Sequence, residues 1–209
     1  MTVAMVGMGW HSWLFREEMK ALLGDISILH PRVVSYDLTQ EEISKLSGAA
    51  LLDEVLLLGG HSIFPESLES QNSLCKAIGE WAIQNFEEGD FAVRTRKIGE
   101  LPVTISSRSF ERKVGRVVAS SGIMVNLESP SNEIVIIIAG SNDGDTHPEP
   151  SEFNEIIVVW GIRVKEWSKE NFSGRSPTDR PYFKPISLEP RQARLLISLS
   201  RVPGREIKA

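Results

Sequence analysis

Residues 91–140 carry the pattern that most constrains what this chain can fold into. In FAVRTRKIG (91–99), alternation and β-branched residues followed by a glycine predict a β-strand. In ERKVGRVVASSG (111–122), valines recur at helical spacing and Gly122 provides a stop, which predicts a helix with a basic outer face. The run MVNLESPSNEIVIIIAG (124–140) predicts two strands joined by a turn at 129–132. We therefore expect a strand, a basic helix and a hairpin to form a small α/β unit.

The sequence before this unit predicts alternating strands and helices. We expect strands at 2–7 and 32–38, and amphipathic helices at 10–24 and 39–48 that each end at a glycine. The run 50–60 is so apolar that periodicity does not separate strand from helix. Pro65 opens a further predicted helix over 65–86.

The sequence after the unit changes character. A polar loop is expected at 139–154 and a strand at 155–167, broken at Gly161. Residues 168–190 contain four prolines, at 177, 181, 185 and 190, which predicts an extended linker leading into a helix at 190–202. We thus predict an α+β fold with an N-terminal α/β unit (1–64), a second α/β domain (65–167) and a Pro-rich linker with a terminal helix (168–209).

Charge is unevenly distributed along the chain. The net charge of −5 disfavours a polyanionic partner when it is taken alone. However, residues 91–116 contain seven basic and two acidic residues, and residues 163–209 contain eleven basic and five acidic residues. Because salt screens charges over roughly 8–10 Å, a polyanion responds to the local patch and not to the total. Two interpretations stay open: a nucleic-acid surface, or two solvated basic faces without a ligand.

Several classes of function are disfavoured by what the sequence lacks. The single cysteine, Cys75, excludes an internal disulfide and a Cys-rich zinc site, and it is expected to be buried in a helix. The four histidines share no ligand spacing, and no Walker A, GxSxG or GxGxxG motif is present, so we expect no metal site and no catalytic residues. Without a membrane-spanning run or a signal-peptide pattern, we expect a cytoplasmic protein with no membrane partner.

Cations in and after the central unit are the candidate binding residues. Arg94 and Arg96 point from the same face of the predicted strand, and three further cations cover about one turn of the following helix. Such a lattice suits phosphates spaced along an RNA strand. The predicted contacts are Arg94, Arg96, Lys97, Arg112, Lys113 and Arg116, extended along the linker by Arg175, Arg180 and Lys184. Four aromatics are nearby for base stacking, namely Phe91, Phe110, Tyr182 and Phe183, although Phe91 and Phe110 equally suit a core.

Two stretches of sequence resemble known proteins. Residues 91–99 and 111–140 resemble a THUMP domain, an RNA-binding module of tRNA-modifying enzymes. Residues 174–207 resemble the segment that joins this domain to the methyltransferase domain in archaeal enzymes that make N2-methylguanosine at position 10 of tRNA. In that family an RPxFxP-like linker precedes a helix with an L-x-P-x-x-A-R pattern, matched here by Arg180, Pro181, Phe183, Pro185, Leu188, Pro190, Ala193 and Arg194. The N-terminal unit fits the ferredoxin-like domain of those enzymes.

The chain also departs from the family. Neither the glycine-rich DPFxGxG loop that holds S-adenosylmethionine nor an NPPY- or DPPY-like motif is present. The resemblance therefore implies a tRNA-binding module, without a catalytic domain or a cofactor of its own, that positions tRNA through its acceptor end. The alternative is a non-catalytic subunit that docks on a separately encoded tRNA methyltransferase, with the helix at 190–202 supplying the contact.

Overall fold

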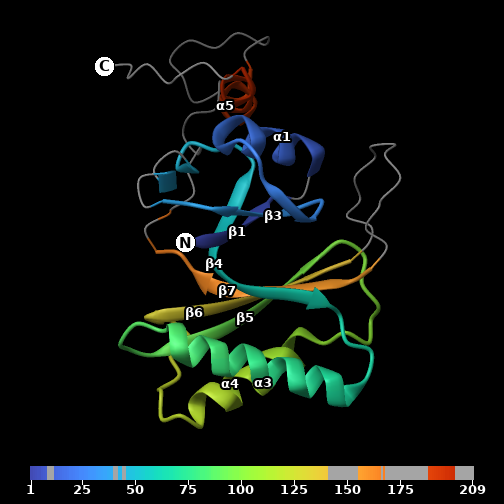
Figure 1. Cartoon of the computed structure of the whole chain (residues 1–209), viewed down its shortest axis with the longest axis vertical. Helices are drawn as coiled ribbons and strands as arrows, with labels where there is room; N and C mark the ends of the chain where they lie inside the picture. Colours follow the sequence, from blue (N-terminus) through green and yellow to red (C-terminus); the bar gives the residue numbers. More distant parts are fainter. Residues whose placement is uncertain are drawn as a thin grey trace.

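The computed structural model describes residues 1–8, 12–39, 42–43, 46–140, 155–165, 167 and 188–200. These residues form a mixed α/β fold with one seven-stranded sheet in the order β2-β3-β1-β4-β7-β6-β5 (Figure 1). The strands are β1 (Thr2–Gly7), β2 (Ser27–His30), β3 (Val33–Asp37), β4 (Leu52–Ile63), β5 (Phe91–Ile98), β6 (Asn132–Ala139) and β7 (Ile157–Arg163). The helices are α1 (Ser12–Leu23), α3 (Leu68–Asn85), α4 (Ser107–Ala119) and α5 (Pro190–Leu199). Within the described ranges, no helix combines the length and the apolar character needed to cross a bilayer.

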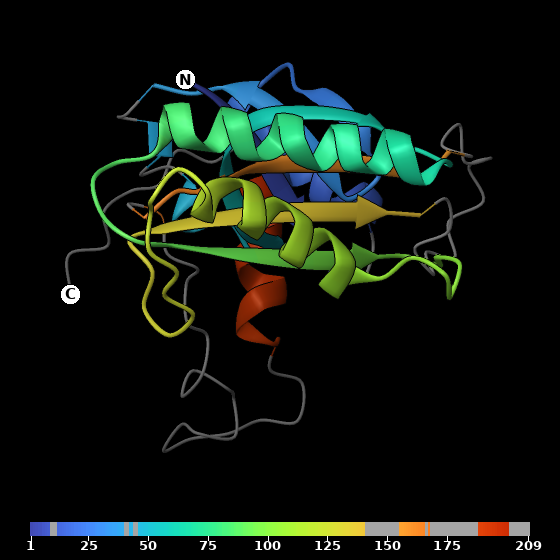
Figure 2. The same cartoon turned by 90° about the horizontal axis from the view of Figure 1, so that it is seen from below.

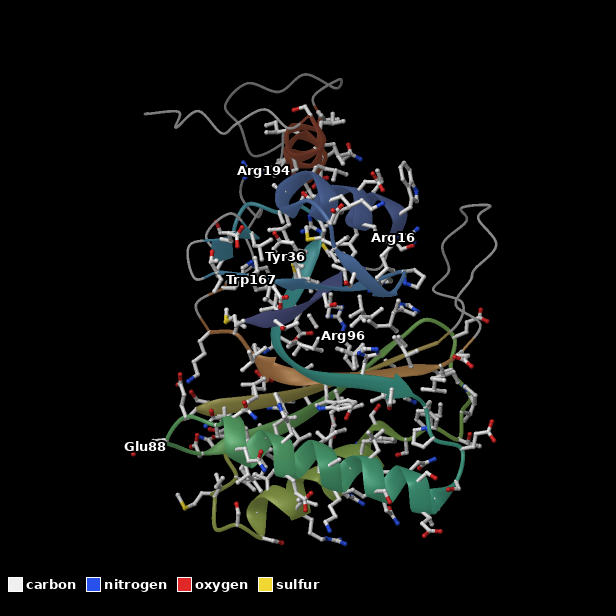
Figure 3. All side chains as sticks on the ribbon, viewed as in Figure 1. Arg16, Tyr36, Glu88, Arg96, Trp167 and Arg194 are labelled. Atoms are coloured by element: carbon white, nitrogen blue, oxygen red, sulfur yellow. The ribbon has the colours of Figure 1, made fainter. Side chains whose placement is uncertain are left out.

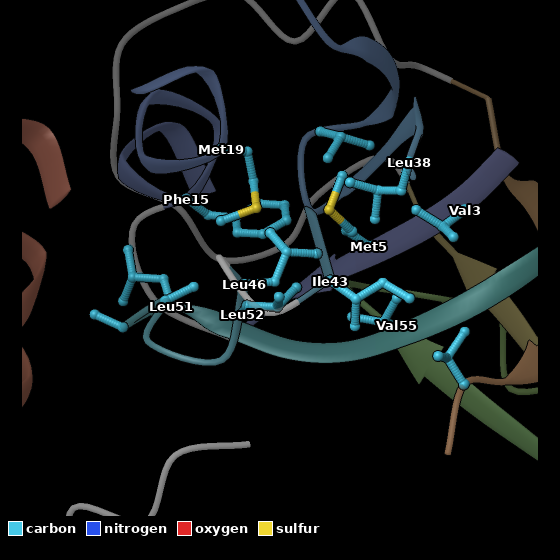
Figure 4. Packing of buried hydrophobic residues seen from close by; sticks show 14 of the residues in the cluster. Val3, Met5, Phe15, Met19, Leu38, Ile43, Leu46, Leu51, Leu52 and Val55 are labelled. Atoms are coloured by element: carbon cyan, nitrogen blue, oxygen red, sulfur yellow. The ribbon is translucent and has the colours of Figure 1, made fainter. Parts of the chain in front are cut away.

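The N-terminal half of the sheet contains β2, β3, β1 and the first part of β4. Strand β1 pairs antiparallel with β3 on one side and with β4 on the other. Helix α1 covers this half through Phe15 and Met19, which pack with β-strand residues such as Met5 and Val55 in a fully buried cluster (Figure 4). The predicted strands at 2–7 and 32–38 and the predicted helix at 10–24 are confirmed, whereas β2 is absent from the sequence predictions.

Strand β4 belongs to both halves of the sheet. Its first residues pair with β1, and the residues from Leu56 to Ile63 pair antiparallel with β7. The ambiguous apolar run at 50–60 is therefore a strand, and its apolar character follows from burial on both faces. Strand β7 continues through Gly161, so the predicted break there is wrong. A Cβ at this position would collide with the carbonyl oxygen of Leu57, so the glycine permits close approach of β4.

The C-terminal half is built on a strand–helix–strand crossover. Strand β5 leads into α4, and the chain returns as β6, which pairs parallel with β5 at the edge of the sheet. The hairpin predicted within 124–140 is therefore wrong: one strand, β6, forms there, and residue Val125 makes only an isolated bridge to Phe91. Helices α3 and α4 cover one face of this half, with Phe110, Val114 and Val118 of α4 in the core between them and the sheet.

The two halves of the sheet pack against each other. A third buried cluster contains Ala4, Val6 and Val33 from the N-terminal half, and Ile98, Val135 and Ile137 from the C-terminal half. The helices lie on the outside, with α1 and α5 at one end of the molecule and α3 and α4 at the other (Figures 1 and 2). The division at residues 64 and 65 into two domains stays a prediction.

Helix α5 is attached to α1 and to the turn before β4. Pro190 is at its first turn, as predicted, and Leu195 and Ser198 are buried against α1. Arg194, part of the L-x-P-x-x-A-R pattern, donates from Nε to the carbonyl oxygen of Gly48 (Figure 3). Glu18 of α1 is fully buried, and its two carboxylate oxygens accept the backbone N–H groups of Ala50 and Leu51 at 2.7 and 2.8 Å. Burial raises the pKa of Glu18, an effect that these hydrogen bonds oppose.

Replacing Glu18 by alanine tests this attachment. The substitution leaves two buried backbone N–H groups without an acceptor, at about 1–3 kcal/mol each, so we expect the free energy of unfolding to fall by about 2–5 kcal/mol. Glu17→Ala is the matched control, because Glu17 is an exposed neighbour paired with Lys20, and it should change the stability by less than about 0.5 kcal/mol. Urea unfolding of both variants measures the difference. Equal losses would contradict the assigned role of Glu18.

Candidate nucleic-acid interface

Three arginines form a row along the outer face of α4. The helix buries Phe110, Val114 and Val118, which places Arg108, Arg112 and Arg116 on the opposite, exposed side. Successive members are four residues apart, so their α-carbons follow one another at about 6 Å along the helix axis. We call Arg108, Arg112 and Arg116 the α4 arginine row.

The α4 arginine row is not neutralised by neighbouring carboxylates. Within the described part of the chain, none of the three guanidinium groups makes an ion pair or a hydrogen bond. The nearest acid in sequence, Glu111, is engaged elsewhere: its Oε1 accepts the backbone N–H of Thr95, on the edge strand β5, at 2.8 Å. This contact covers one free donor of the sheet edge and keeps the carboxylate at β5. The row therefore consists of three unpaired positive charges on a helix that covers one face of the sheet.

Lys113, a predicted contact on the same helix, does not belong to this row. Its Nζ is buried and has no hydrogen-bond partner among the described residues. It lies close enough to Cys75 of α3 to act on the thiol electrostatically, although burial still raises the pKa of Cys75. Cys75 is thus a buried helical residue, as predicted. Lys113 lies at the contact between α3 and α4 and not on the exposed face.

The predicted cations of β5 form ion pairs or hydrogen bonds with other residues of the chain. Arg94 contacts Glu133 at 3.5 Å and donates to the carbonyl oxygen of Leu127. Arg96 pairs with Asp53 and, at 3.4 Å, with Glu54. Lys97 donates from Nζ to the carbonyl oxygen of Ile105. All three cations therefore have partners in the folded chain.

Arg94 and Arg96 also lie on the other face of the sheet from α4. They alternate with Val93, which packs against the helices, and share their face with Ile98 of the cluster between the two halves. Figure 3 shows Arg96 between the halves of the sheet, away from α4. The strand arginines and the helix cations that were predicted to form one lattice therefore lie on two different faces, because alternation along β5 places Arg94 and Arg96 opposite α4.

Glu54 is the centre of an ion-pair network on this face of the sheet. Its side chain is 4% exposed, and Oε1 accepts from Arg163 of β7 at 2.5 Å while Oε2 faces Arg96. Arg163 also binds Glu133 at 2.7 Å, which connects β4, β5, β6 and β7 through one chain of ion pairs. Burial raises the pKa of Glu54, and the two arginines act against that shift. This network is structural.

The remaining predicted site residues divide as follows. Arg175, Arg180 and Lys184 lie outside the described residues, as do Tyr182 and Phe183. Phe91 and Phe110 are 1% and 2% exposed, so they belong to the core and not to a stacking surface.

Arg108 was missed because the predicted helix begins at residue 111, whereas α4 begins at Ser107. The four-residue spacing of Arg108, Arg112 and Arg116 is the sequence signal that identifies it. The described residues contain no cluster of His, Cys, Asp or Glu that suits a metal ion.

The loop after α4 is held in one conformation by Asp90. The Asp90 carboxylate accepts the backbone N–H of Ser131 and the side-chain amide of Asn126, both at 2.6 Å. Asn126 in turn accepts the N–H groups of Glu128 and Ser129, each at 3.1 Å. These hydrogen bonds to the ionised carboxylate lower the pKa of Asp90.

Comparison with known proteins shows sequence similarity to tRNA-modifying enzymes. The chain is 30% identical over 129 residues to the tRNA (guanine(10)-N2)-dimethyltransferase of Pyrococcus abyssi (strain GE5 / Orsay), which covers 61% of this chain and 32% of that protein. It is 32% identical over 114 residues to the tRNA (guanine(10)-N2)-dimethyltransferase of Methanothermobacter thermautotrophicus, which covers 54% of this chain and 28% of that protein. The chain thus spans about a third of the length of these relatives. No family model matches it.

Solved structures share the fold. TrmN from Thermus thermophilus superimposes with a TM-score of 0.56 at 18% identity, over 95% of this chain and 54% of that chain. A possible methylase from Clostridium difficile 630 gives a TM-score of 0.50 at 14% identity, over 78% of this chain and 40% of that chain. The resemblance noted in the sequence is therefore confirmed as similarity to tRNA (guanine-N2)-dimethyltransferases over about half of the chain. The identification of a THUMP domain stays a prediction.

The pH dependence of stability tests the anchoring of the loop by Asp90. Folding lowers the pKa of Asp90 from its usual value of 3.8. The ionised carboxylate therefore stabilises the fold fully at pH values above 3.8, and this stabilisation is lost as the pH falls through the lower pKa of the folded state. Asp90→Asn removes the titration. We expect the wild type to be more stable than the variant by a constant amount between pH 5 and 7, and the difference to narrow below about pH 4. Urea unfolding at several pH values measures it, and a difference that does not depend on pH would contradict the assignment.

Proposed function

We propose that this chain binds tRNA through the α4 arginine row and serves as the RNA-binding part of a tRNA-modification system. The observation that carries the proposal is the row itself: three exposed guanidinium groups, evenly spaced and without ion-pair partners in the described residues. The chain as a whole has a net charge of −5. Exposed, unpaired cations on one helix nevertheless create a local positive potential, which attracts a polyanion.

The geometry of the row suits a phosphate backbone more than a single small anion. Successive α-carbons rise by about 6 Å, so the row extends over about 12 Å along the helix axis. Long, flexible arginine side chains at this spacing reach different phosphates of one strand instead of converging on one. The contacts are with the backbone, so they position the RNA without reading its sequence.

Sequence similarity to tRNA (guanine(10)-N2)-dimethyltransferases supports tRNA as the polyanion. On this proposal β5, α4 and β6 belong to a THUMP-like domain, and β1 to β4 with α1 belong to a ferredoxin-like unit. The chain engages the acceptor end of tRNA and sets the distance to the modified base. It acts in the cytoplasm, supplies binding and no chemical step, and holds no S-adenosylmethionine of its own.

Neutralising the α4 arginine row tests the proposal. The triple variant Arg108→Gln, Arg112→Gln, Arg116→Gln should weaken tRNA binding at least ten-fold at low salt. The slope of log K against log salt should become shallower by about 2–3 units, because three phosphate contacts are lost. Fluorescence titration of labelled tRNA between 20 and 200 mM salt measures both quantities.

A charge-matched variant controls for net charge. Lys20, Lys76 and Lys165 are exposed but paired with Glu17, Glu80 and Glu87, so Lys→Gln at these three positions changes the total charge equally. This variant should keep the wild-type slope. Equal slopes for the two triple variants, or no binding of tRNA by the wild type at low salt, would contradict the proposal.

A second candidate function is supported by the outer face of α5. Leu196 and Ile197 are 58% and 49% exposed although Leu195 and Ser198 of the same helix are buried against α1. Helix α5 thus has an inner face that attaches it and an outer face that is apolar and uncovered in the described structure. On this alternative the chain is a non-catalytic subunit that docks on a separately encoded tRNA methyltransferase.

Polar substitution of the outer face distinguishes this alternative. The variant Leu196→Ser, Ile197→Ser should leave folding and tRNA affinity unchanged but abolish co-elution with a tRNA methyltransferase of the same organism in gel filtration. The control is Gln192→Ala, which removes an exposed polar side chain of α5. Co-elution retained by the double serine variant, or no complex with any such methyltransferase, would count against a docking role.

A further inference from the structure

An apolar surface lies beside the α4 arginine row. In the loop that follows α4, Met124, Val125 and Leu127 are 75%, 55% and 60% exposed. We call these three residues the apolar loop. We propose that the apolar loop contacts the face of an unpaired nucleobase of the RNA whose phosphates are held by the α4 arginine row. This inference rests on the proposed function and adds a base-binding element to it.

The apolar loop is preorganised. Met124 accepts from the backbone N–H of Phe91 at 3.0 Å, and Asn126 donates its backbone N–H to Phe91 at 2.9 Å. Asp90 and Asn126 hold the following turn through the short hydrogen bonds described above. The guanidinium group of Arg94 binds the carbonyl oxygen of Leu127. The backbone is therefore fixed from the side of the sheet, so the exposed apolar side chains require little further ordering when they bind.

The position of the loop is continuous with the row. Helix α4 ends at Ala119, three residues after Arg116, and Met124 follows five residues later. Figure 1 shows the loop, drawn in yellow, on the same side of the sheet as α4, and in Figure 2 it extends past the edge strand β5. A strand of RNA that follows the row toward the C-terminal end of α4 therefore arrives at the apolar loop.

The chemistry favours a nucleobase over a protein partner. Three side chains make a surface far smaller than the roughly 800 Å² that each partner contributes to a stable protein interface. Residues 121–131, which form the loop, contain one acidic residue, Glu128, against the three cations of the row, and this balance of charge favours an anionic ligand. A base is flat and apolar on its face and carries its own phosphate, and Met and Leu side chains contact base faces when a base is unstacked.

A cycle of protein and RNA variants tests the inference. The RNAs are one hairpin with a single unpaired nucleotide, placed as a 3′ tail, a 5′ tail or an internal bulge, and each has an abasic counterpart with the same number of phosphates. For at least one placement, the wild type should bind the base-containing RNA about ten-fold more tightly than its abasic counterpart. The variant Met124→Ser, Val125→Ser, Leu127→Ser should bind both equally, with an unchanged salt slope.

The matched control is Val103→Ser. Val103 is fully exposed in the loop that precedes α4, at the other end of the helix, so the variant removes exposed apolar surface and should keep the ten-fold preference. Equal affinity of the wild type for base-containing and abasic RNAs in all three placements, with a steep salt slope, would overturn the base contact and leave the proposed function standing. Loss of all RNA binding by the wild type would refute both. A serine variant that retains the preference, or that changes the oligomeric state of the chain in sedimentation, would also overturn the base contact.

Discussion

The buried carboxylate of Glu54 is the interaction on which the arrangement of charge in this protein depends. It lies between the two halves of the sheet with 4% of its side chain exposed, and a carboxylate in such a place requires cationic partners. Arg96 of β5 and Arg163 of β7 supply them, and Glu133 extends the pairing to Arg94. Moving either arginine to an external phosphate would leave the buried Glu54 carboxylate with one cationic partner instead of two, which disfavours the move. The strand arginines are therefore committed to the fold.

This commitment determines which cations are available for a ligand. Helix α4 lies on the opposite face of β5 and β6, so its arginines cannot reach Glu54, and Glu111, the acid nearest to them in sequence, binds the edge strand instead. A basic segment of sequence is thereby divided into a structural set on the strand and a free set on the helix. The same division explains how a chain of net negative charge presents a local positive surface, since paired cations contribute little field beyond a Debye length.

Sequence patterns predicted the local elements well and their arrangement poorly. Alternation and helical spacing identified β1, β3, β5, α1 and α5, because these signals depend on which face of an element is buried. The hairpin expected at 124–140 failed because strand pairing is non-local: β6 pairs with β5 across α4 and not with its own neighbouring residues. The pairing of Arg96 with Asp53 and Glu54 could not be predicted from local sequence either, because Glu54 is 42 residues away from Arg96. Arg108 was missed because the predicted helix starts four residues after the observed start of α4, and helix boundaries are the feature that sequence propensity predicts least well.

The most direct measurement of the central claim is arginine-specific chemical labelling with phenylglyoxal, mapped by mass spectrometry with and without bound tRNA. The arginines of α4 and of the sheet are read in one sample, and Arg94 and Arg163 are exposed enough to react, with 45% and 42% of their side chains accessible. If the helix carries the phosphate contacts, tRNA will protect Arg108, Arg112 and Arg116 and leave the labelling of Arg94 and Arg163 unchanged. Protection of the strand arginines with continued labelling of the helix arginines would contradict it.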